Sequence, residues 1–526
     1  MISLVNTAVC MGVEGRNIRV ETDISKGLPY INIVGLASTT VMEAKERIKS
    51  AIVNAGLEYP RGRITVNLAP AGLRKNGSCL DLPIAIAVLA SDGEINPAKL
   101  KDCGFLGELS LDARVLYVDG VLPMIMSLYK EGVKTIYIPQ ENLYETSIIS
   151  GPEIIPVSSL RQCVEIINTG NKSQIKGCIN EELKVKGPAR HCANKGKANA
   201  EGIRKEEKLD YADIYGQENA KRAISIAVTG RHGLLMVGSP GCGKTMLARR
   251  MPSIMPEMSS EEIIETAVIN SAASGVTNYA LRQRPFRAPH NSIGKAGLLG
   301  GGVHYPIPGE ISLAHNGVLF LDEACEFDRD SLQALRQPLE DKQIVHFRHG
   351  QAYRFPCNFQ LVMATNPCPC GYYGDQEQIC KCSAIQVENY RKKLSGPILD
   401  RIDMRLVMEK VSFENMSKET EKGKSSSELR ADVERGLAFA RKQGRSMPNS
   451  SILDSDLEKY CSLGEEEMDL MNIAYQRLKL SPRSYNRILR VARTIADMDE
   501  SEEIKAQHLT EALSYRTIDV AGIEEP

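Results

Sequence analysis

Hydrophobic and polar residues follow different patterns in successive parts of the chain. Up to residue 168, short apolar runs are separated by turns: "RITVNLAP" and "VKTIYIPQ" predict strands, and "DLPIAIAVLAS" predicts a buried helix. From residue 210 to about 410, strand-like runs alternate with Gly-rich loops and helices, and from about residue 428 the pattern is helical throughout. We therefore expect an α/β chain with a helical C-terminal part.

The clearest helical period lies near the end of the chain, in "SYNRILRVARTIADM". Its apolar and basic residues fall on two different faces of a helix. The apolar face comprises Ile488, Val491, Ala492 and Ile495, and the basic face comprises Arg483, Arg487 and Arg490.

One stretch, residues 169–209, lacks any such pattern. Between residues 171 and 209 there are few large apolar residues, and ten Lys or Arg stand against five Glu. This composition predicts a basic flexible linker between folded parts at 1–168, 210–410 and 411–526. Two functions remain open for the linker, a solvated tether and an arm that touches nucleic-acid phosphates.

Composition limits the function classes. A chain of 526 residues is too long for one ordinary hydrophobic core, so we expect several domains. The formal net charge of −1 shows no overall positive excess that would attract nucleic acid or a membrane, so any basic patch must be local. Neither a secretory signal nor an apolar run of membrane-spanning length is evident. With no export signal, the 14 cysteines indicate reduced thiols, so we expect a cytoplasmic protein that is not bound to a membrane.

The main chemical motif follows the apolar run "GLLMV". "GSPGCGKT" fits G-x-x-x-x-G-K-T, and the following "MLARR" reads as a helix, which is the strand–loop–helix context that a phosphate-binding loop needs. Main-chain N–H groups and Lys244 would hold the phosphates of ATP, and Thr245 would ligate Mg²⁺. The predicted nucleotide-binding residues are Gly238, Ser239, Pro240, Gly241, Cys242, Gly243, Lys244, Thr245 and Met246.

Two further strand ends would complete this site. "NGVLFLDEA" is a buried strand ending in Asp322 and Glu323; Asp322 would join the Mg²⁺ shell, and Glu323 would orient and deprotonate the attacking water. "NFQLVMATNP" ends at Asn366, whose amide could position the same water.

Together these residues resemble the AAA+ ATPases, and more closely the magnesium-chelatase-like group and its ComM/YifB family. The resemblance covers nearly the whole chain except the linker. Its first part is carried by "NLAPAGLRKNGSCLDLPIAIAVLA" and "LGELSLDARVLYVDGVLP". The later part is carried by "FRAPHNSIG", "LLGGG", "PGEISLAHNGVLFLDEACEF", "LRQPLEDKQI", "ATNPCPCGYYGD", "LSGPILDRID" and "LSPRSYNRILRVARTIAD".

The resemblance implies a fold of three parts. These are a Lon-protease-like (S5-like) α+β domain, an AAA+ P-loop α/β domain with an insert in helix 2, and a C-terminal helical lid. The spacing agrees with an insert, because Thr245 and Asp322 are 77 residues apart, far more than a direct strand–helix–strand connection needs. Gly300, Gly301 and Gly302 would suit the tip of a tight loop there.

The resemblance also assigns roles to residues beyond the phosphate loop. Asn366 corresponds to sensor 1, and Arg401 in "LDRID" to the arginine finger that reaches the γ-phosphate of a neighbouring subunit. Arg483 corresponds to the sensor-2 arginine of the lid, with Arg487 as the alternative. A finger acting on a neighbour implies a ring of identical chains, and the family norm is a hexamer.

A cysteine cluster follows Asn366. "NPCPCGYYGDQEQICKCS" contains two C-x-C pairs separated by nine residues, namely Cys368 with Cys370 and Cys380 with Cys382. Four thiolates could hold a structural Zn²⁺ ion, although the usual zinc spacing is C-x₂-C. The alternative is a surface loop with free thiols.

In the first domain, the resemblance to Lon raises the question of proteolysis. Cys79 in "RKNGSCLD" stands at the nucleophile position, and Pro123 and Met124 stand where the Glu-Lys pair would be. Both members of the catalytic dyad are therefore replaced, so we expect a non-proteolytic domain that assists assembly or binds a partner.

Three functions remain possible. The resemblance implies an ATP-driven ring motor on single-stranded or branched DNA, of the branch-migration type, with Arg282, Arg284, Arg287 and Lys295 as candidate phosphate contacts. A metal-chelatase motor is the second; the resemblance disfavours it, because chelatase ATPase subunits are expected to lack both the Lon-like domain and the C-x-C pairs. A protein-remodelling chaperone is the third.

Overall fold

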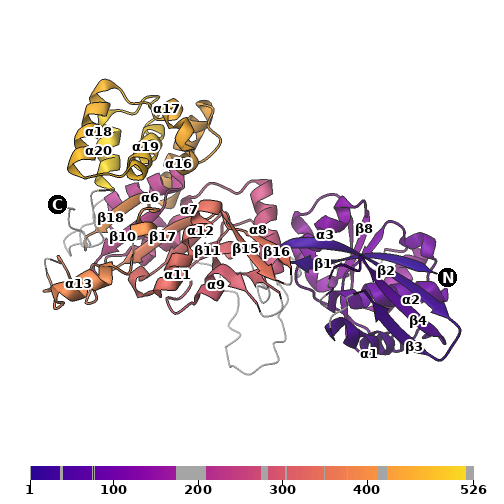
Figure 1. The fold of residues 1–526 in the computed structure, drawn as a ribbon. Helices are drawn as coiled ribbons and strands as arrows, with labels where there is room; N and C mark the ends of the chain where they lie inside the picture. Colours follow the sequence, from indigo (N-terminus) through magenta and orange to yellow (C-terminus); the bar gives the residue numbers. More distant parts are fainter. Residues whose placement is uncertain are drawn as a thin grey trace.

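The structure is a computed structural model that describes residues 2–35, 39–73, 75, 78–172, 209–273, 282–302, 305–348, 350–375, 377–394, 396–410 and 423–516. Figure 1 shows an N-terminal unit at one end, a central sheet with its helices, and a group of C-terminal helices beside the centre. Most of the predicted linker, residues 173–208, lies outside the described residues.

The N-terminal unit is built on a seven-stranded mixed sheet with the order β3-β4-β2-β1-β5-β8-β9. Its strands are β1 (Ser3–Met11), β2 (Glu14–Ser25), β3 (Tyr30–Val34), β4 (Arg63–Ala69), β5 (Cys103–Phe105), β8 (Thr135–Pro139) and β9 (Glu153–Val157). A separate two-stranded ribbon pairs β6 (Glu108–Leu109) with β7 (Val115–Leu116). The helices are α1 (Thr39–Asn54), α2 (Asp81–Asp92), α3 (Val121–Lys130) and α4 (Leu160–Thr169).

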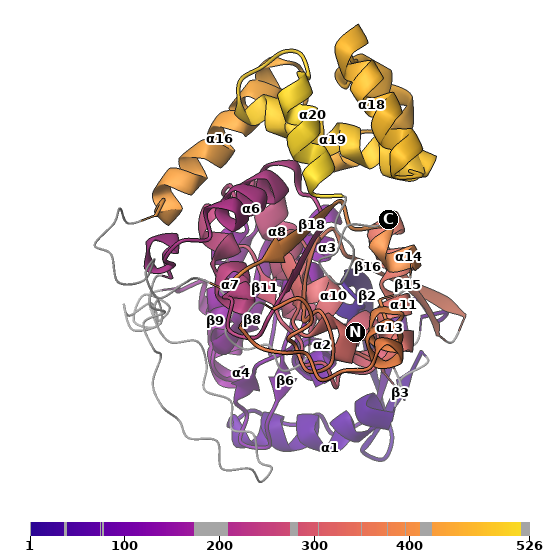
Figure 2. The same cartoon turned by 90° about the vertical axis from the view of Figure 1, so that its left-hand side faces the viewer.

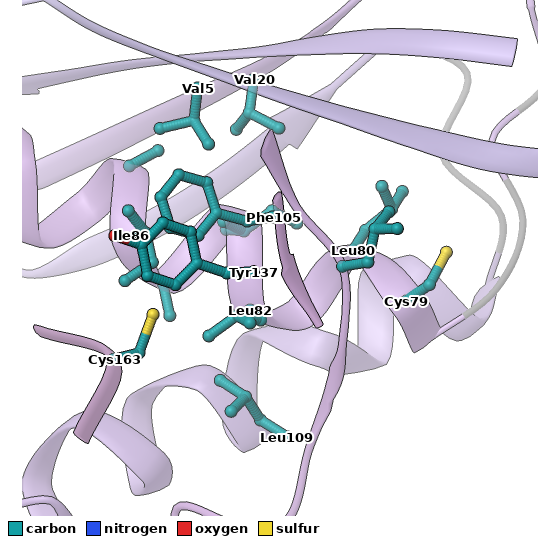
Figure 3. Packing of buried hydrophobic residues seen from close by; sticks show 14 of the residues in the cluster. Val5, Val20, Cys79, Leu80, Leu82, Ile86, Phe105, Leu109, Tyr137 and Cys163 are labelled. Carbon is teal, nitrogen blue, oxygen red and sulfur yellow. The ribbon is translucent and has the colours of Figure 1, made fainter. Parts of the chain in front are cut away.

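The predicted strands and helix of this unit are confirmed. Every second residue of β4 is buried, so one face of the strand meets the core, and the first ten residues of α2 are all buried. Phe105 and Tyr137 stack at the centre of the core with ring centroids 4.8 Å apart, and aliphatic side chains surround them (Figure 3).

The central part is a five-stranded sheet with the order β11-β14-β17-β10-β18, and all its strand pairs are parallel. Its strands are β10 (Leu234–Gly238), β11 (Phe286–Arg287), β14 (Val318–Leu321), β17 (Gln360–Thr365) and β18 (Met404–Met408). The helices around it are α6 (Glu218–Gly230), α7 (Lys244–Ile254), α8 (Ser260–Ala272), α11 (Arg329–Ala334), α12 (Arg336–Asp341), α13 (Ala384–Arg391) and α14 (Gly396–Leu399). The middle strands are buried along their length, as expected of a parallel sheet covered on both faces.

Two hairpins interrupt this α/β alternation. The first pairs β12 (Gly300–Gly301) with β13 (Ile307–Pro308), between the short helices α9 (Lys295–Leu299) and α10 (Glu310–Leu313), and so stands where an insert in helix 2 was expected. The second pairs β15 (Gln343–Arg348) with β16 (Gln351–Pro356).

The glycines of the first hairpin do not all lie at its tip, contrary to the prediction. Gly300 and Gly301 form one arm, and only Gly302 is at the turn. Gly300 has φ +85°, and a Cβ there would lie 2.3 Å from the carbonyl oxygen of Ile307. Glycine is needed at this position because the two arms approach so closely.

The C-terminal part is helical, as predicted. It comprises α16 (Ser426–Lys442), α17 (Leu457–Tyr460), α18 (Glu465–Arg477), α19 (Pro482–Met498) and α20 (Ala506–Ser514). The predicted apolar face of α19 is confirmed, since its four apolar residues are all buried. Helices α16 and α19 pack on α6 of the central part, which joins the lid to the sheet (Figure 2).

The N-terminal unit contacts the central part through α8 and the second hairpin. The N–H of Gly120 donates to the carbonyl of Ser271 at 2.6 Å, and the N–H of Leu122 donates to the Ser271 hydroxyl at 3.3 Å. At Gly12, a Cβ would lie 3.3 Å from the Phe355 ring. Among the described helices, not one combines the length and the apolar character needed to cross a membrane.

Candidate nucleotide-binding site

The phosphate loop connects β10 to α7. Gly241 and Gly243 have φ values of +83° and +97°, which favour glycine, and α7 begins at Lys244. The loop therefore leads directly into the N-terminus of α7, where the partial positive charge of the helix favours anions. Met246 lies two residues further and is exposed.

The ammonium group of Lys244 is held inside the loop. It donates to the carbonyl oxygens of Gly238 at 2.6 Å and Ser239 at 3.1 Å, and to Oδ1 of Asn366 at 3.2 Å. The structure therefore brings together Lys244 and Asn366, which are 122 residues apart in the sequence and were both predicted to belong to the nucleotide site. Phosphate oxygens are the natural competitors for these contacts, because they are stronger acceptors for a cation.

The predicted magnesium ligands also meet. The hydroxyl of Thr245 donates to Oδ2 of Asp322 at 2.7 Å, across 77 residues of sequence. Parallel strands place their carboxyl ends at one edge of the sheet, so the loop after β10, Asp322 after β14 and Asn366 after β17 converge there. A hydroxyl and a carboxylate are ligands that suit Mg²⁺ when it also binds nucleotide phosphates.

Glu323 has a partner that sequence reasoning did not identify. Its backbone is left-handed, with φ +51°, and its Oε2 accepts a hydrogen bond from Nδ2 of Asn291 at 3.2 Å. Asn291 lies in "FRAPHNSIG", a stretch that the sequence analysis used only for the resemblance. An amide that holds the carboxylate can decide whether Glu323 faces a water molecule at the γ-phosphate.

Arg401 lies at the opposite edge of the sheet. It precedes β18, which runs parallel to β10 with Met404 opposite Leu234 and Met408 opposite Gly238. The start of β18 is thus about 16 Å, one five-residue strand, from the phosphate loop. Arg401 is therefore placed away from the nucleotide site of its own chain.

Arg483, at the start of α19, lies beside Arg401. Both arginines bind Oε1 of Glu340 in α12, Arg483 at 3.3 Å. The side chain of Arg401 is 8% exposed and that of Arg483 is 56% exposed. Glu340 belongs to "LRQPLEDKQI" and carried no predicted role; nothing in the sequence alone connects it to two arginines 61 and 143 residues away.

Arg487, the alternative sensor-2 residue, is engaged differently. It donates to Oδ1 of Asp403 at 2.6 Å, and the other carboxylate oxygen of Asp403 contacts Nδ1 of His232 at 3.2 Å. Burial opposes ionisation of Asp403, but His232 and Arg487 outweigh it and lower the pKa of Asp403 to about 2. Arg487 thus ties α19 to the start of β18.

The four predicted cysteine ligands form one cluster. The sulfur atoms of Cys368, Cys370, Cys380 and Cys382 all lie within 4.8 Å of one another. Three of the separations are 3.3, 3.7 and 3.5 Å, well beyond the roughly 2.0 Å of a disulfide bond. Cys368 is buried and the other three are partly buried.

The four predicted nucleic-acid contacts differ in accessibility. Arg284 is buried, and it binds Glu262 together with three main-chain carbonyl groups, so its prediction as a surface contact is wrong. Arg287 forms two hydrogen bonds of 2.7 Å with Glu310. Arg282 and Lys295 are exposed.

At the Lon-type nucleophile position, Cys79 is buried beside Leu80 (Figure 3). Burial, with a contribution from Asp81, raises the pKa of its thiol to about 12. Pro123 and Met124 are buried in α3. None of these three residues supplies a base or an activated nucleophile.

The site defines a P-loop nucleotide-binding protein, because an open parallel sheet holds a phosphate loop, an acidic pair and a polar amide at its carboxyl edge.

Comparison with protein families identifies the class of protein more closely. Residues 210–416 match the family described as magnesium chelatase, subunit ChlI, and residues 423–516 match its C-terminal domain. Residues 20–142 match a family described as subunit ChlI of Mg-chelatase.

Similarity to whole proteins covers almost the entire chain. The competence protein ComM of Haemophilus influenzae is 38% identical over 98% of both chains. The YifB protein of Escherichia coli is 39% identical over 98% of this chain and 97% of its own. The chain belongs to the ComM/YifB family of magnesium-chelatase-like proteins. Lon protease 2 of Bacillus subtilis is 26% identical over 30% of this chain and 33% of its own length.

One of these matches weakens an earlier inference. The absence of a Lon-like domain from chelatase subunits counted against a chelatase role, yet a family named for a chelatase subunit matches residues 20–142. Only the C-x-C pairs remain as a feature against that role.

Proposed function

We propose that the chain is an ATP-hydrolysing AAA+ motor that works as a ring of identical subunits on DNA. The main support for a ring is that Arg401 and Arg483 lie at the edge of the sheet opposite the phosphate loop. Lys244, Thr245, Asp322, Glu323 and Asn366 form one half of a site. The other half, the arginines, reaches a nucleotide only on a neighbouring chain.

ATP with Mg²⁺ is the expected ligand of this composite site. When bound, Mg²⁺ would supply positive charge that neutralises the negative charge developing on the phosphates. Thr245 and Asp322 would hold the ion, Lys244 would bind the phosphates, and Glu323 would take the proton of the attacking water. Arg401 and Arg483 would supply positive charge from the next subunit.

The second hairpin supports DNA as the partner. Phe347 is 75% exposed beside the exposed Arg348, and Arg354 is exposed on the opposite strand. An exposed aromatic ring among basic side chains suits a single strand, because every base has a face to stack and every nucleotide has a phosphate. A relative named a competence protein also favours DNA, since competence is the uptake of DNA by bacteria.

The test is the ATPase rate against a panel of single-stranded, forked and four-way DNA. We expect stimulation that is strong at about 50 mM salt and falls steeply by about 200 mM, as phosphate contacts predict. Arg348→Ala should reduce the stimulation and leave the DNA-free rate unchanged, with Arg435→Ala in α16 as the matched control. A chain that neither binds nor responds to any of these DNAs at low salt is not a DNA motor.

A chelatase-type motor is the second candidate, because the matched families carry that description. Such a motor would hydrolyse ATP with the same composite site but respond to a protein partner rather than to DNA. Hydrolysis that is unaffected by DNA, yet depends on Arg401 of a neighbouring chain, would favour this alternative.

A further inference from the structure

We infer that the four-cysteine cluster is a structural zinc site that braces the phosphate loop, so that loss of the metal weakens nucleotide binding. The inference rests on the nucleotide site proposed above and adds to it a second, distinct site. It connects two motifs, "GSPGCGKT" and "NPCPCGYYGDQEQICKCS", that the sequence keeps more than 100 residues apart.

The donor set fits zinc. Four sulfurs around Zn²⁺ at about 2.3 Å lie about 3.8 Å from one another at the corners of a tetrahedron. The sulfurs of Cys368, Cys370 and Cys380 are separated by 3.3, 3.7 and 3.5 Å, close to this spacing. The sulfur of Cys382 lies within 4.8 Å of each of them. Main-chain N–H groups of Tyr372 and Lys381 also donate to the sulfur of Cys370, which orients it.

Two residues between the two C-x-C pairs, Gly371 and Asp375, lie against the phosphate loop. Gly371 has φ +87°, and a Cβ there would lie 2.7 Å from two ring carbons of Pro240. Asp375 forms a side-chain hydrogen bond with Ser239. Two consecutive residues of the phosphate loop are thus held by one segment, and that segment is held at both ends by the cysteines.

Further contacts fix this segment to the sheet. Lys410, two residues after β18, binds the Asp375 carboxylate at 2.9 Å and lies over the ring of Tyr372 at 5.4 Å from its centroid. The Asp375 side chain is 5% exposed, and it also accepts from the N–H groups of Glu377 and Gln378. Asp375 is therefore a positioning residue with a defined geometry and not a solvated surface acid.

The cluster itself must be closed for this brace to form. Four thiols within 4.8 Å of one another, one buried and three partly buried, have only weak mutual attraction as S–H groups, whereas a metal ion joins all four at once. A metal that joins the two C-x-C pairs lowers the number of conformations open to Gly371 and Asp375. The loop that these residues touch then keeps the shape that accepts phosphates.

The experiment uses the full chain and three measurements. These are zinc content per chain, the Kd for a fluorescent ATP analogue, and hydrogen exchange of peptides that cover residues 238–245. We expect one zinc per chain in protein purified without chelators. Removal of the metal, or Cys380→Ser, should weaken the Kd by about tenfold and speed exchange in the phosphate loop. Cys103→Ser, in the N-terminal unit, is the matched control and should change nothing.

A second variant separates the brace from the metal. Asp375→Asn should keep its zinc and still weaken the Kd by about tenfold, because the charged contact to Ser239 and Lys410 is lost. Glu377→Gln is the control. Glu377 also pairs with Lys410, but it is 74% exposed and the contact is longer, at 3.7 Å.

Each alternative outcome has its own meaning. Absence of stoichiometric zinc overturns the metal site. Zinc that can be removed without any change in phosphate-loop exchange overturns the brace. If the wild type binds zinc, and exchange responds to its removal, while no nucleotide binds, then the nucleotide function fails and the brace stands.

Discussion

Arg483 and Glu340 form an ion pair in which Nη2 of the arginine lies 3.3 Å from Oε1 of the glutamate, and Arg401 binds the same oxygen. One carboxylate therefore contacts two arginines, and Arg401 precedes β18 at the edge of the sheet opposite the phosphate loop of its own chain. Without this carboxylate, two like charges would repel each other at close range.

Glu340→Gln should consequently slow ATP hydrolysis by about tenfold or more, without weakening nucleotide binding, since arginine fingers supply about 10³- to 10⁵-fold in related phosphoryl-transfer sites. The rate is measured together with the Kd for an ATP analogue and with particle size. Asp341→Asn, the next residue on α12, is the control. A variant that hydrolyses ATP at the normal rate would show that the shared carboxylate is only a surface contact.

Glu323 and Asn291 predict two different kinetic results. Glu323→Gln should bind ATP normally and lower kcat by about 10²- to 10⁴-fold, the contribution of a general base. Asn291→Ala removes only the group that holds the carboxylate at 3.2 Å, so it should leave binding unchanged and lower kcat by less than Glu323→Gln does. Single-turnover hydrolysis separates chemistry from product release. Loss of ATP binding in Glu323→Gln would contradict the assignment.

The nucleotide site was largely predictable from sequence because its residues follow the ends of recognisable strands. The loop after β10, Asp322 after β14 and Asn366 after β17 needed only the rule that parallel strands end at one edge. The helical lid was predictable for a similar reason, since the apolar residues Ile488, Val491, Ala492 and Ile495 of α19 recur at a helical period.

The contacts that join these motifs were not predictable. Glu340 binds Arg401 and Arg483 across 61 and 143 residues, and Asp375 reaches Ser239 from the segment after β17. Such pairs depend on how helices and loops pack, which leaves no periodic signal in the chain. Arg284 failed for the same reason: its sequence context looks basic and exposed, while tertiary packing places it against Glu262.

Cys79 allows a direct test of the N-terminal domain as a non-proteolytic unit. Burial raises the pKa of its thiol to about 12, so at pH 8 only about one molecule in 10⁴ carries the thiolate. We expect Cys79 to resist alkylation in the folded chain and to react fully in denaturant, as measured by mass spectrometry of the labelled peptide. We also expect the chain to leave an unfolded protein substrate uncut. Rapid labelling of Cys79 in the native chain would indicate an activated nucleophile instead.

Asp403 predicts how the lid responds to acid. Its pKa falls from an ordinary 3.8 to about 2 in the folded chain, where His232 and Arg487 bind it. A carboxylate with a lowered pKa contributes stability that is complete well above pH 4 and is lost as the pH falls toward 2. The contribution at pH 7 is on the order of 2 kcal/mol.

Asp403→Asn should therefore lower the opening free energy of α19 and β18 by that amount at pH 7, and the difference from wild type should narrow as the pH falls from 4 to 2. Hydrogen exchange of peptides from these two elements measures opening locally, which a chain of several folded units requires. Asp400→Asn, an exposed residue three positions earlier, is the control. A difference that stays constant across this pH range would mean that Asp403 stabilises the lid by packing rather than by its charge, because an uncharged contact does not respond to protonation.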